Sequence, residues 1–191
     1  INDDTIAAGQ GFGMHPHRNM EIITVMVEGA LTHADSMGNS AVLHAGEVQR
    51  MSAGSGIVHS EINQTGEPCR LLQIWIEPIQ LGIQPAYEQK PFAIGEGWTP
   101  LIEPDASGDA MAIEHPVRLW RAQPLRQQHL PLPAAEERWV WLQVIDGELT
   151  LNSEGSPKQS LRRGDGLCLI QEAATQGELN GLSEHLSLIH I

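Results

Sequence analysis

The sequence predicts an antiparallel all-β protein made of two similar β-sandwiches or barrels in tandem. Helical periodicity is scarce, whereas short β-prone runs broken by Gly, Asn, Asp and Pro recur along all 191 residues. The phrases VEGALTH and IDGELTL begin corresponding hairpins, and LHAGEVQRM is echoed later by LRRGDGLCLI. Such internal similarity indicates a duplication in which each copy forms one β unit.

The first half, residues 1–92, is expected to be nearly continuous sheet. The segment EIITVMVEG, residues 21–29, predicts a strand that enters a turn. Residues 30–48 predict two strands around a Met-Gly-Asn turn. The run CRLLQIWIEP, residues 69–78, predicts a strand that its proline ends.

The second half begins with an irregular stretch. The period is broken from about Gln80 to Pro104, residues 93–110 are expected to connect the halves, and a second β-rich block follows over residues 111–191. In RWVWLQVIDGELTLN, residues 138–152, alternation places two sets of side chains on opposite faces of one strand: Trp139, Trp141 and Gln143 on one face, and Val140, Leu142 and Val144 on the other. A hairpin turn is expected at Asp146-Gly147.

The composition excludes several classes of partner. The 24 acidic and 11 basic residues give a formal net charge of -13, which would repel a phosphate backbone, so direct nucleic-acid binding is not expected. No run approaches the roughly 20 apolar residues that a membrane-spanning helix needs. Cys69 and Cys168 are far apart and show no ligand spacing, which predicts free core thiols in a reducing compartment, the cytoplasm. Because the chain starts with INDD, neither Met nor a signal peptide, it is expected to lack its natural beginning.

Two short motifs point to a metal site. His15 and His17 alternate by two, so on a strand both imidazoles project to one face, and His59 and Glu61 repeat the same spacing. An isolated His-x-His pair is often only a pair of exposed strand histidines. If the strands that carry these two pairs are neighbours, however, they bring three imidazoles and one carboxylate together. That set suits a divalent transition metal and leaves two positions on an octahedral ion for water, oxygen or a chelating substrate.

The remaining histidines lack a paired partner and are expected to have structural or surface roles: His33, His44, His115, His129, His185 and His190. Among them His33 is the one to follow, because it lies on the strand after the first turn. Glu21 is interpreted as an exposed strand carboxylate or as a fifth ligand. The glycine-rich GQGFG precedes a strand instead of a helix, and SAGSG lacks the strand-to-helix turn of a nucleophile elbow, so nucleotide binding and serine hydrolysis are not favoured.

The glycine and histidine spacings resemble the two motifs of the cupin superfamily. The first motif is matched, with a last gap of seven residues instead of six, by Gly9, His15, His17, Glu21 and Gly29. The second motif, without the usual proline and with a longer loop, is matched by Gly46, Gly56, His59 and Asn63. The His-x-Glu variant at His59, with the phrases QGFGMHPHRNMEIITVMVEG, DSMGNS and AGEVQRMSAGSGIVHSE, closely resembles the pirin family of bicupins. This resemblance is dense from Ile1 to about Phe92.

The resemblance implies a bicupin whose N-terminal barrel binds one divalent metal ion through four residues: His15, His17, His59 and Glu61. The C-terminal barrel is expected to be metal-free, since its strands over residues 138–152 and 162–170 contain no histidine. Iron(II) is the expected ion, with nickel, copper, manganese and zinc as alternatives.

The resemblance also implies an activity, quercetin 2,3-dioxygenation, in which O2 opens the central ring of a flavonol and carbon monoxide is released. The 3-hydroxyl proton of a metal-chelating flavonol would pass to Glu61, which is expected to be base as well as ligand. Two other functions stay open: a non-enzymatic metal-binding regulatory protein that acts through protein partners, and a metal-dependent isomerase on the same scaffold. The expected assembly is a monomer.

Overall fold

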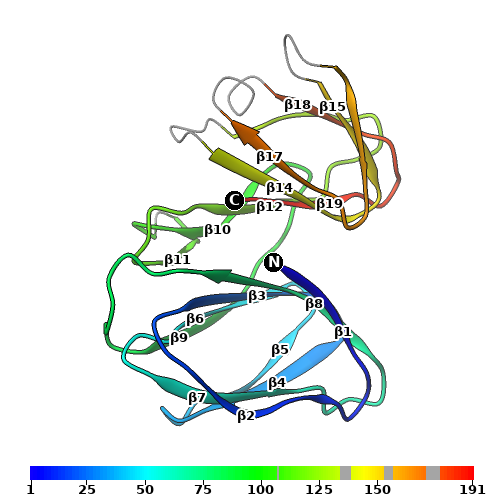
Figure 1. Cartoon of the computed structure of the whole chain (residues 1–191). Coiled ribbons are helices and arrows are strands. Elements are labelled where there is room, and N and C mark those ends of the chain that lie inside the picture. Colours follow the sequence, from blue (N-terminus) through cyan, green and yellow to red (C-terminus); the bar gives the residue numbers. More distant parts are fainter. Residues whose placement is uncertain (107, 134–138, 153–156, 171–176) are drawn as a thin grey trace. The chain divides into compact units, whose positions relative to one another are not determined.

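Every regular element in the described residues is a β-strand, as the scarcity of helical periodicity predicted (Figure 1). The computed structural model describes residues 1–106, 108–133, 139–152, 157–170 and 177–191. This part of the chain contains no helix that is long and apolar enough to cross a membrane. The chain folds as two units, Ile1–Phe92 and Ala93–Ile191.

The first unit is built from two antiparallel sheets. Its strands are β1 (Asn2–Ile6), β2 (Gly11–His17), β3 (Glu21–Glu28), β4 (Ala30–Asp35), β5 (Ser40–His44), β6 (Glu47–Ser52), β7 (Ile57–Ile62), β8 (Cys69–Ile76) and β9 (Ala86–Pro91). One sheet has the order β1-β8-β3-β6-β9 and the other the order β2-β7-β4-β5, and Figure 1 shows them as two layers. The two single strands predicted over residues 21–29 and 69–78 and the strand pair around the Met-Gly-Asn turn are confirmed.

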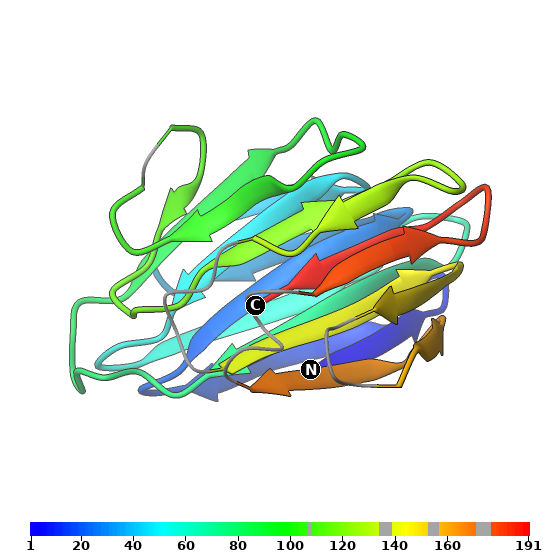
Figure 2. The ribbon, with the colours of Figure 1, turned by 90° about the horizontal axis from the view of Figure 1, so that it is seen from above.

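The second unit also has two sheets. Its strands are β10 (Thr99–Glu103), β11 (Met111–Ala112), β12 (Leu119–Ala122), β13 (His129–Pro131), β14 (Trp139–Asp146), β15 (Glu148–Asn152), β16 (Gln159–Arg162), β17 (Gly166–Ile170), β18 (Glu178–Gly181) and β19 (Ser187–His190). The sheet orders are β11-β10-β12-β19-β14-β17 and β13-β18-β15-β16, with a parallel pair only between β10 and β11 among the described pairings. Figure 2 shows yellow, orange and red strands of this unit side by side. Residues 93–110, expected to connect the halves, contain β10, which pairs with β12.

The strand order repeats, which supports the predicted duplication. The order β1-β8-β3-β6 of the first unit corresponds to β12-β19-β14-β17 of the second, and β2-β7-β4-β5 corresponds to β13-β18-β15-β16. The expected hairpins at Gly29 and Gly147 are wrong, however, because the strands on either side of each glycine belong to different sheets. Both glycines have positive φ, 71° and 86°, and a Cβ there would lie within 3.0 Å of backbone atoms of Cys69 and His185, respectively. They are corners at which the chain passes from one sheet to the other.

The interior of the first unit is layered along its strands. Successive interior residues of β3 are Ile22, Thr24 and Met26, and each belongs to a different layer. Met26 packs in an apolar cluster with Ile6, Leu31, Leu43, Cys69 and Leu71, and Ile22 packs in a second one with Met51, Ala53 and Ile57. Between them, Thr24 is the register partner of both Gln49 and Gln73. A row of polar side chains therefore separates two apolar layers.

The second unit has leucine at the positions of Thr24 and Gln49 of this polar row, and histidine at the position of Gln73, since Leu142 pairs with Leu167 and with His190. Leu142 and Leu167 are register partners, as Thr24 and Gln49 are in the first unit. Leu151 and Leu179 likewise pair at the positions of His33 and Glu61. Leu142, Leu151 and Leu179 are buried in one apolar cluster, against which Leu167 packs. The same framework thus encloses a polar layer in one unit and an apolar core in the other.

Two further sequence expectations can be compared with the fold. In β14 the side chains of Val140, Leu142 and Val144 are buried while Trp139 and Trp141 are exposed, as the alternation predicted, but Gln143, expected on the face of the tryptophans, is buried too. Cys69 and Cys168 are both free, but only Cys69 is buried, so the expectation of two core thiols is wrong for Cys168. The reason is again alternation: the leucines on either side of Cys168 in β17 face the apolar core, which leaves the thiol on the outer face.

Candidate metal centre

Strand pairing brings the sequence-predicted ligands into one region of the first unit. His15 on β2 is the register partner of His59 on β7, and β7 pairs on its other side with β4. Along β7, His59 and Glu61 are buried while Val58 between Ile57 and His59 is exposed. This alternation sends both predicted ligands of β7 to the interior, because successive strand residues face opposite ways.

Three imidazoles form a compact group. One nitrogen from each of His15, His17 and His59 lies within 4.8 Å of the others. The Nε2 atoms of His15 and His59 are 3.1 Å apart. Two neighbouring ligands on one octahedral ion, with metal–nitrogen bonds of about 2.1 Å, would lie about 3 Å apart. The spacing of this pair therefore fits a shared metal ion.

The protonation of the group also fits a metal ion. The Nδ1 atom of His15 lies 2.7 Å from the carbonyl oxygen of Gly13, which can only accept, so Nδ1 carries the proton and Nε2 keeps its lone pair. Burial, with the charges of His15 and His17 adding to it, lowers the pKa of His59 to about 3. Burial and the neighbouring His15 also lower the pKa of His17. Neutral imidazoles with free lone pairs are what a metal ion requires.

Glu61 is held in a different way from the histidines. Its Oε1 accepts a hydrogen bond from Gln49 Nε2 at 3.0 Å and its Oε2 one from Gln73 Nε2 at 2.8 Å. Gln73 in turn accepts a hydrogen bond from the indole N–H of Trp75 at 3.0 Å. Each carboxylate oxygen keeps a second lone pair, so these bonds orient Glu61 without using up its capacity as a ligand.

The structure does not place the predicted ligands in a single group. Glu61 lies within 4.8 Å of ligand atoms of His59 and His33, and this second group shares only His59 with the first. His33 is the direct register partner of Glu61, and Asp35 is the partner of His59. The four predicted residues are therefore joined through His59, and His33 is a neighbour that the sequence interpretation assigned to a structural or surface role.

His33 is tightly held by its surroundings. Its Nε2 lies 3.1 Å from Asp35 Oδ2, and its ring stacks on Tyr87 with a centroid distance of 4.5 Å. Burial disfavours ionisation of Asp35, but hydrogen bonds from Asn39, His33 and the backbone of Met37 outweigh it and lower the pKa of Asp35. Burial, with nearby carboxylates, raises the pKa of Tyr87, so its phenol stays protonated. The sequence did carry a signal here, because His33-Ala34-Asp35 repeats the His-x-acid spacing of His59-Ser60-Glu61.

Glu21 is neither of the two things expected of it. It is buried, not exposed, and it accepts a hydrogen bond of 2.6 Å from the hydroxyl of Ser52. It precedes Ile22, whose side chain packs in the interior with Ile57, so Glu21 points to the opposite face of β3. Within the described residues, neither group of possible metal ligands contains it.

The rim of the histidine group is partly apolar. Trp75 is about half exposed and contacts the His17 ring edge-on with a centroid distance of 5.1 Å. Phe12 approaches His15 in the same manner at 6.3 Å. An aromatic molecule that approached these imidazoles would meet aromatic side chains on two of them.

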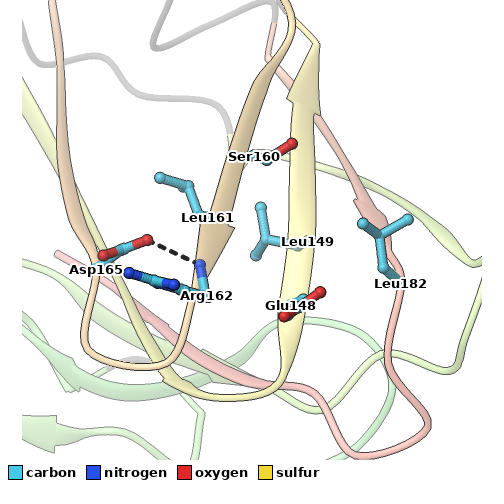
Figure 3. Close-up of a pocket in the computed structure, with 7 residues that line it drawn as sticks. All are labelled: Glu148, Leu149, Ser160, Leu161, Arg162, Asp165 and Leu182. Carbon is cyan, nitrogen blue, oxygen red and sulfur yellow. Dashed lines mark hydrogen bonds between the residues drawn. The ribbon is translucent and has the colours of Figure 1, made fainter.

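A separate concavity lies in the second unit. It has a volume of about 340 Å³ and is lined by Glu148, Leu149, Ser160, Leu161, Arg162, Asp165 and Leu182 (Figure 3). The carboxylate of Asp165 accepts a hydrogen bond of 2.9 Å from the backbone N–H of Arg162, so it is already engaged within its own turn. None of the lining residues is a histidine or a cysteine, and the described groups of possible metal ligands lie in the first unit.

Comparison with known proteins decides the family. A family model described as Pirin matches residues 1–76, and one described as the quercetinase C-terminal cupin domain matches residues 101–188. Quercetin 2,3-dioxygenase of Escherichia coli strain K12 is 42% identical over 187 residues, which cover 97% of this chain and 79% of that protein. The chain belongs to the pirin family.

Other pirins and their structures extend this result. The Pirin-like protein of Caulobacter vibrioides is 53% identical over 95 residues, 50% of this chain and 41% of that protein. The structure of bacterial pirin YhhW from Escherichia coli in complex with nickel(II) has a TM-score of 0.87 and 40% identity, and the match covers 98% of this chain and 79% of that one. The resemblance to pirins and the all-β bicupin fold expected from the sequence are thereby confirmed.

Proposed function

We propose that this pirin is a metal-dependent dioxygenase that opens the central ring of a flavonol such as quercetin with O2 and releases carbon monoxide. The observation that carries the proposal is the imidazole group of the first unit, with His15 and His59 Nε2 atoms at a spacing suited to one ion. Relatives named quercetin 2,3-dioxygenase that align over 97% of the chain support this choice of reaction.

The proposed ligands are His15, His17, His59 and Glu61, and iron(II) is the proposed ion. The nickel(II) complex of bacterial pirin YhhW supports a divalent ion in this family. A bound divalent ion would supply Lewis acidity and would lower the pKa of the 3-hydroxyl group of a chelating flavonol. The C-terminal barrel is proposed to be metal-free, and the leucines at the positions of Thr24, Gln49, His33 and Glu61 support this.

The protein groups supply binding, orientation and a proton acceptor. Burial keeps His17 and His59 neutral, so their lone pairs are available at neutral pH. Gln49 and Gln73 fix the carboxylate of Glu61, whose second lone pairs can accept the flavonol 3-hydroxyl proton. The exposed ring of Trp75 beside His17 offers a surface on which a flat aromatic substrate can stack.

The test is anaerobic reconstitution with each candidate metal, followed by addition of quercetin and O2. Loss of the flavonol absorbance together with release of carbon monoxide is expected, with iron(II) giving the highest rate. The His59→Ala variant is the control, because it removes the residue shared by both groups of ligands. Turnover no higher than that of the control with every metal would rule out the dioxygenase.

One observation favours a second function, that of a metal-binding regulator acting through protein partners. Phe12 and Met14 on β2 and Val58 on β7 are exposed apolar side chains on the strands that carry the histidines. Exposed apolar side chains that lie together are typical of protein interaction sites. Intact metal binding without turnover of quercetin under any of the conditions above would favour this function.

A further inference from the structure

Two buried nitrogen atoms beside the metal centre lack hydrogen-bond partners. They are Nδ1 of His59 and Nδ1 of His33, and neither has a partner among the residues that the structure describes. Both side chains are 1% exposed. A buried polar atom without a partner costs about 1–3 kcal/mol, so two of them in neighbouring rings call for an explanation.

The two atoms have complementary hydrogen-bonding roles. Nε2 of His33 faces the carboxylate of Asp35 at 3.1 Å and must donate to it, which leaves Nδ1 of His33 as an acceptor. Nε2 of His59 faces the other histidines of the metal group, so as a ligand it keeps its lone pair and Nδ1 of His59 carries the proton. One orphaned atom is therefore a donor and the other an acceptor.

The two rings are neighbours, separated by enough space for one bridging water between the donor and the acceptor. Their centroids are 5.3 Å apart with an interplanar angle of 54°. Asp35, which anchors His33, is the register partner of His59. Asp35 is itself fixed by N–H groups of Met37 and Asn39 at 2.8–3.0 Å, and Tyr87 stacks on the ring of His33. The acceptor is thus held rigidly on a strand next to the strand that carries the ligand.

We propose that one buried water accepts a hydrogen bond from Nδ1–H of His59 and donates one to Nδ1 of His33, and that His33 so positions His59 as a metal ligand. Asp35, His33 and His59 then form a chain in which the carboxylate sets the tautomer of His33 and His33 sets that of His59. Metal-bound histidines generally donate their second N–H to a carboxylate, a backbone carbonyl or a water, and loss of such an outer partner typically weakens metal binding by 10–100-fold. The inference rests on the metal site of the proposed function but not on its reaction.

The first test needs no substitution. Long-range ¹H–¹⁵N spectra of the zinc-loaded protein, labelled with ¹⁵N-histidine, report the protonated nitrogen of each ring. The expected result is a proton on Nε2 of His33 and on Nδ1 of His59, the latter protected from exchange. A proton on Nδ1 of His33, a zinc-bound shift for His33, or a rapidly exchanging Nδ1 proton on His59 would overturn the inference.

The second test measures zinc affinity by competition with a chelator. His33→Phe keeps a ring against Tyr87 but has no acceptor, and a 10–100-fold loss of affinity is expected. His33→Gln restores an acceptor and is expected to recover part of that loss, which a merely structural role of the ring would not predict. His44→Phe, at an exposed position of β5, is the matched control and should bind zinc as the unaltered protein does.

The outcomes separate this inference from the proposed reaction. Affinity of His33→Phe within twofold of the unaltered protein, or failure of the unaltered protein to bind zinc at all, would overturn it. Absence of quercetin turnover would leave it standing, because both tests use zinc binding and ring protonation as readouts. If His33→Phe fails to fold, the spectra of the unaltered protein decide.

Discussion

The hydrogen bonds around Glu61 allow its structural role to be separated from its role as a ligand. Glu61 accepts one amide N–H from Gln49 and one from Gln73, and all three side chains are buried. In Glu61→Gln the new amide must point its NH2 group at one of these donors, whichever way it is turned. One buried donor then has no acceptor, and a loss of about 1–3 kcal/mol in the free energy of unfolding is expected.

A second substitution should restore the bonds without restoring the ligand. When Gln73→Glu is added to Glu61→Gln, the amide at position 61 donates to the carboxylate at position 73 and still accepts from Gln49. The carboxylate at position 73 also accepts from Trp75, as the amide oxygen does now. The double variant is therefore expected to recover most of the lost stability, whereas both variants should bind zinc at least tenfold more weakly because the carboxylate has left position 61.

Tyr87 provides the assay for the first unit alone. It is the single tyrosine of the chain, so 3-fluorotyrosine labelling gives one ¹⁹F signal, from β9. Urea unfolding of the metal-free protein, followed by this signal, yields the free energy of unfolding of each variant. A single variant as stable as the unaltered protein, or a double variant as unstable as the single one, would refute this role of the hydrogen bonds from Gln49 and Gln73.

Three further predictions concern the hydrogen bond from Trp75 to Gln73, the protonation of His59 and the corner at Gly29. Trp75→Phe removes the N–H bonded to Gln73 but keeps a ring beside His17, so unfolding by urea should show a loss of about 0.5–1.5 kcal/mol with little change in zinc affinity. Because the pKa of His59 falls from 6.5 to about 3 on folding, the unfolded chain takes up a proton that the folded metal-free protein does not, and stability should fall as the pH drops from 6.5 towards 3. This titration should contribute a slope of about 1.4 kcal/mol per pH unit, and the slope should be smaller by that amount in His59→Phe, as urea midpoints at several pH values would reveal. Gly29 and Gly9 share a φ of 71°, but only at Gly29 would a Cβ meet another residue, so thermal unfolding should show Gly29→Ala to be less stable than Gly9→Ala by about 1–3 kcal/mol, and equal losses would contradict the corner.

The histidine pairs could be predicted because strand periodicity is local. Residues two apart on one strand face the same way, and this rule needs no knowledge of the neighbouring strand. The same counting failed for Glu21, because the chain turns between β2 and β3 and the face that a residue occupies is set anew on the next strand. The corners at Gly29 and Gly147 were mistaken for hairpins because a glycine turn between two strands looks the same in sequence whether or not those strands pair.

The partners of the predicted ligands could not be found from the sequence. Gln49 and Gln73 lie on strands of the opposite sheet, and Thr24 on β3 brings them into one row. Such a row depends on register between strands that are far apart in the chain. His33 had a usable signal in its His-x-Asp spacing, but its value becomes clear only when β4 is seen to pair with β7.

Leucines replace most of the polar row in the second unit, so the stability of the two units should depend to different extents on the supply of metal ions. The leucine-filled unit has an ordinary apolar core, whereas the other buries several polar groups and gains stability from any ion that binds only its folded form. When metal is scarce, we expect the first unit to open more often and to be cut first by proteases, leaving the second unit as the longer-lived fragment. Limited proteolysis with and without zinc would show whether metal supply sets the lifetime of this protein, and identical cleavage under both conditions would show that it does not.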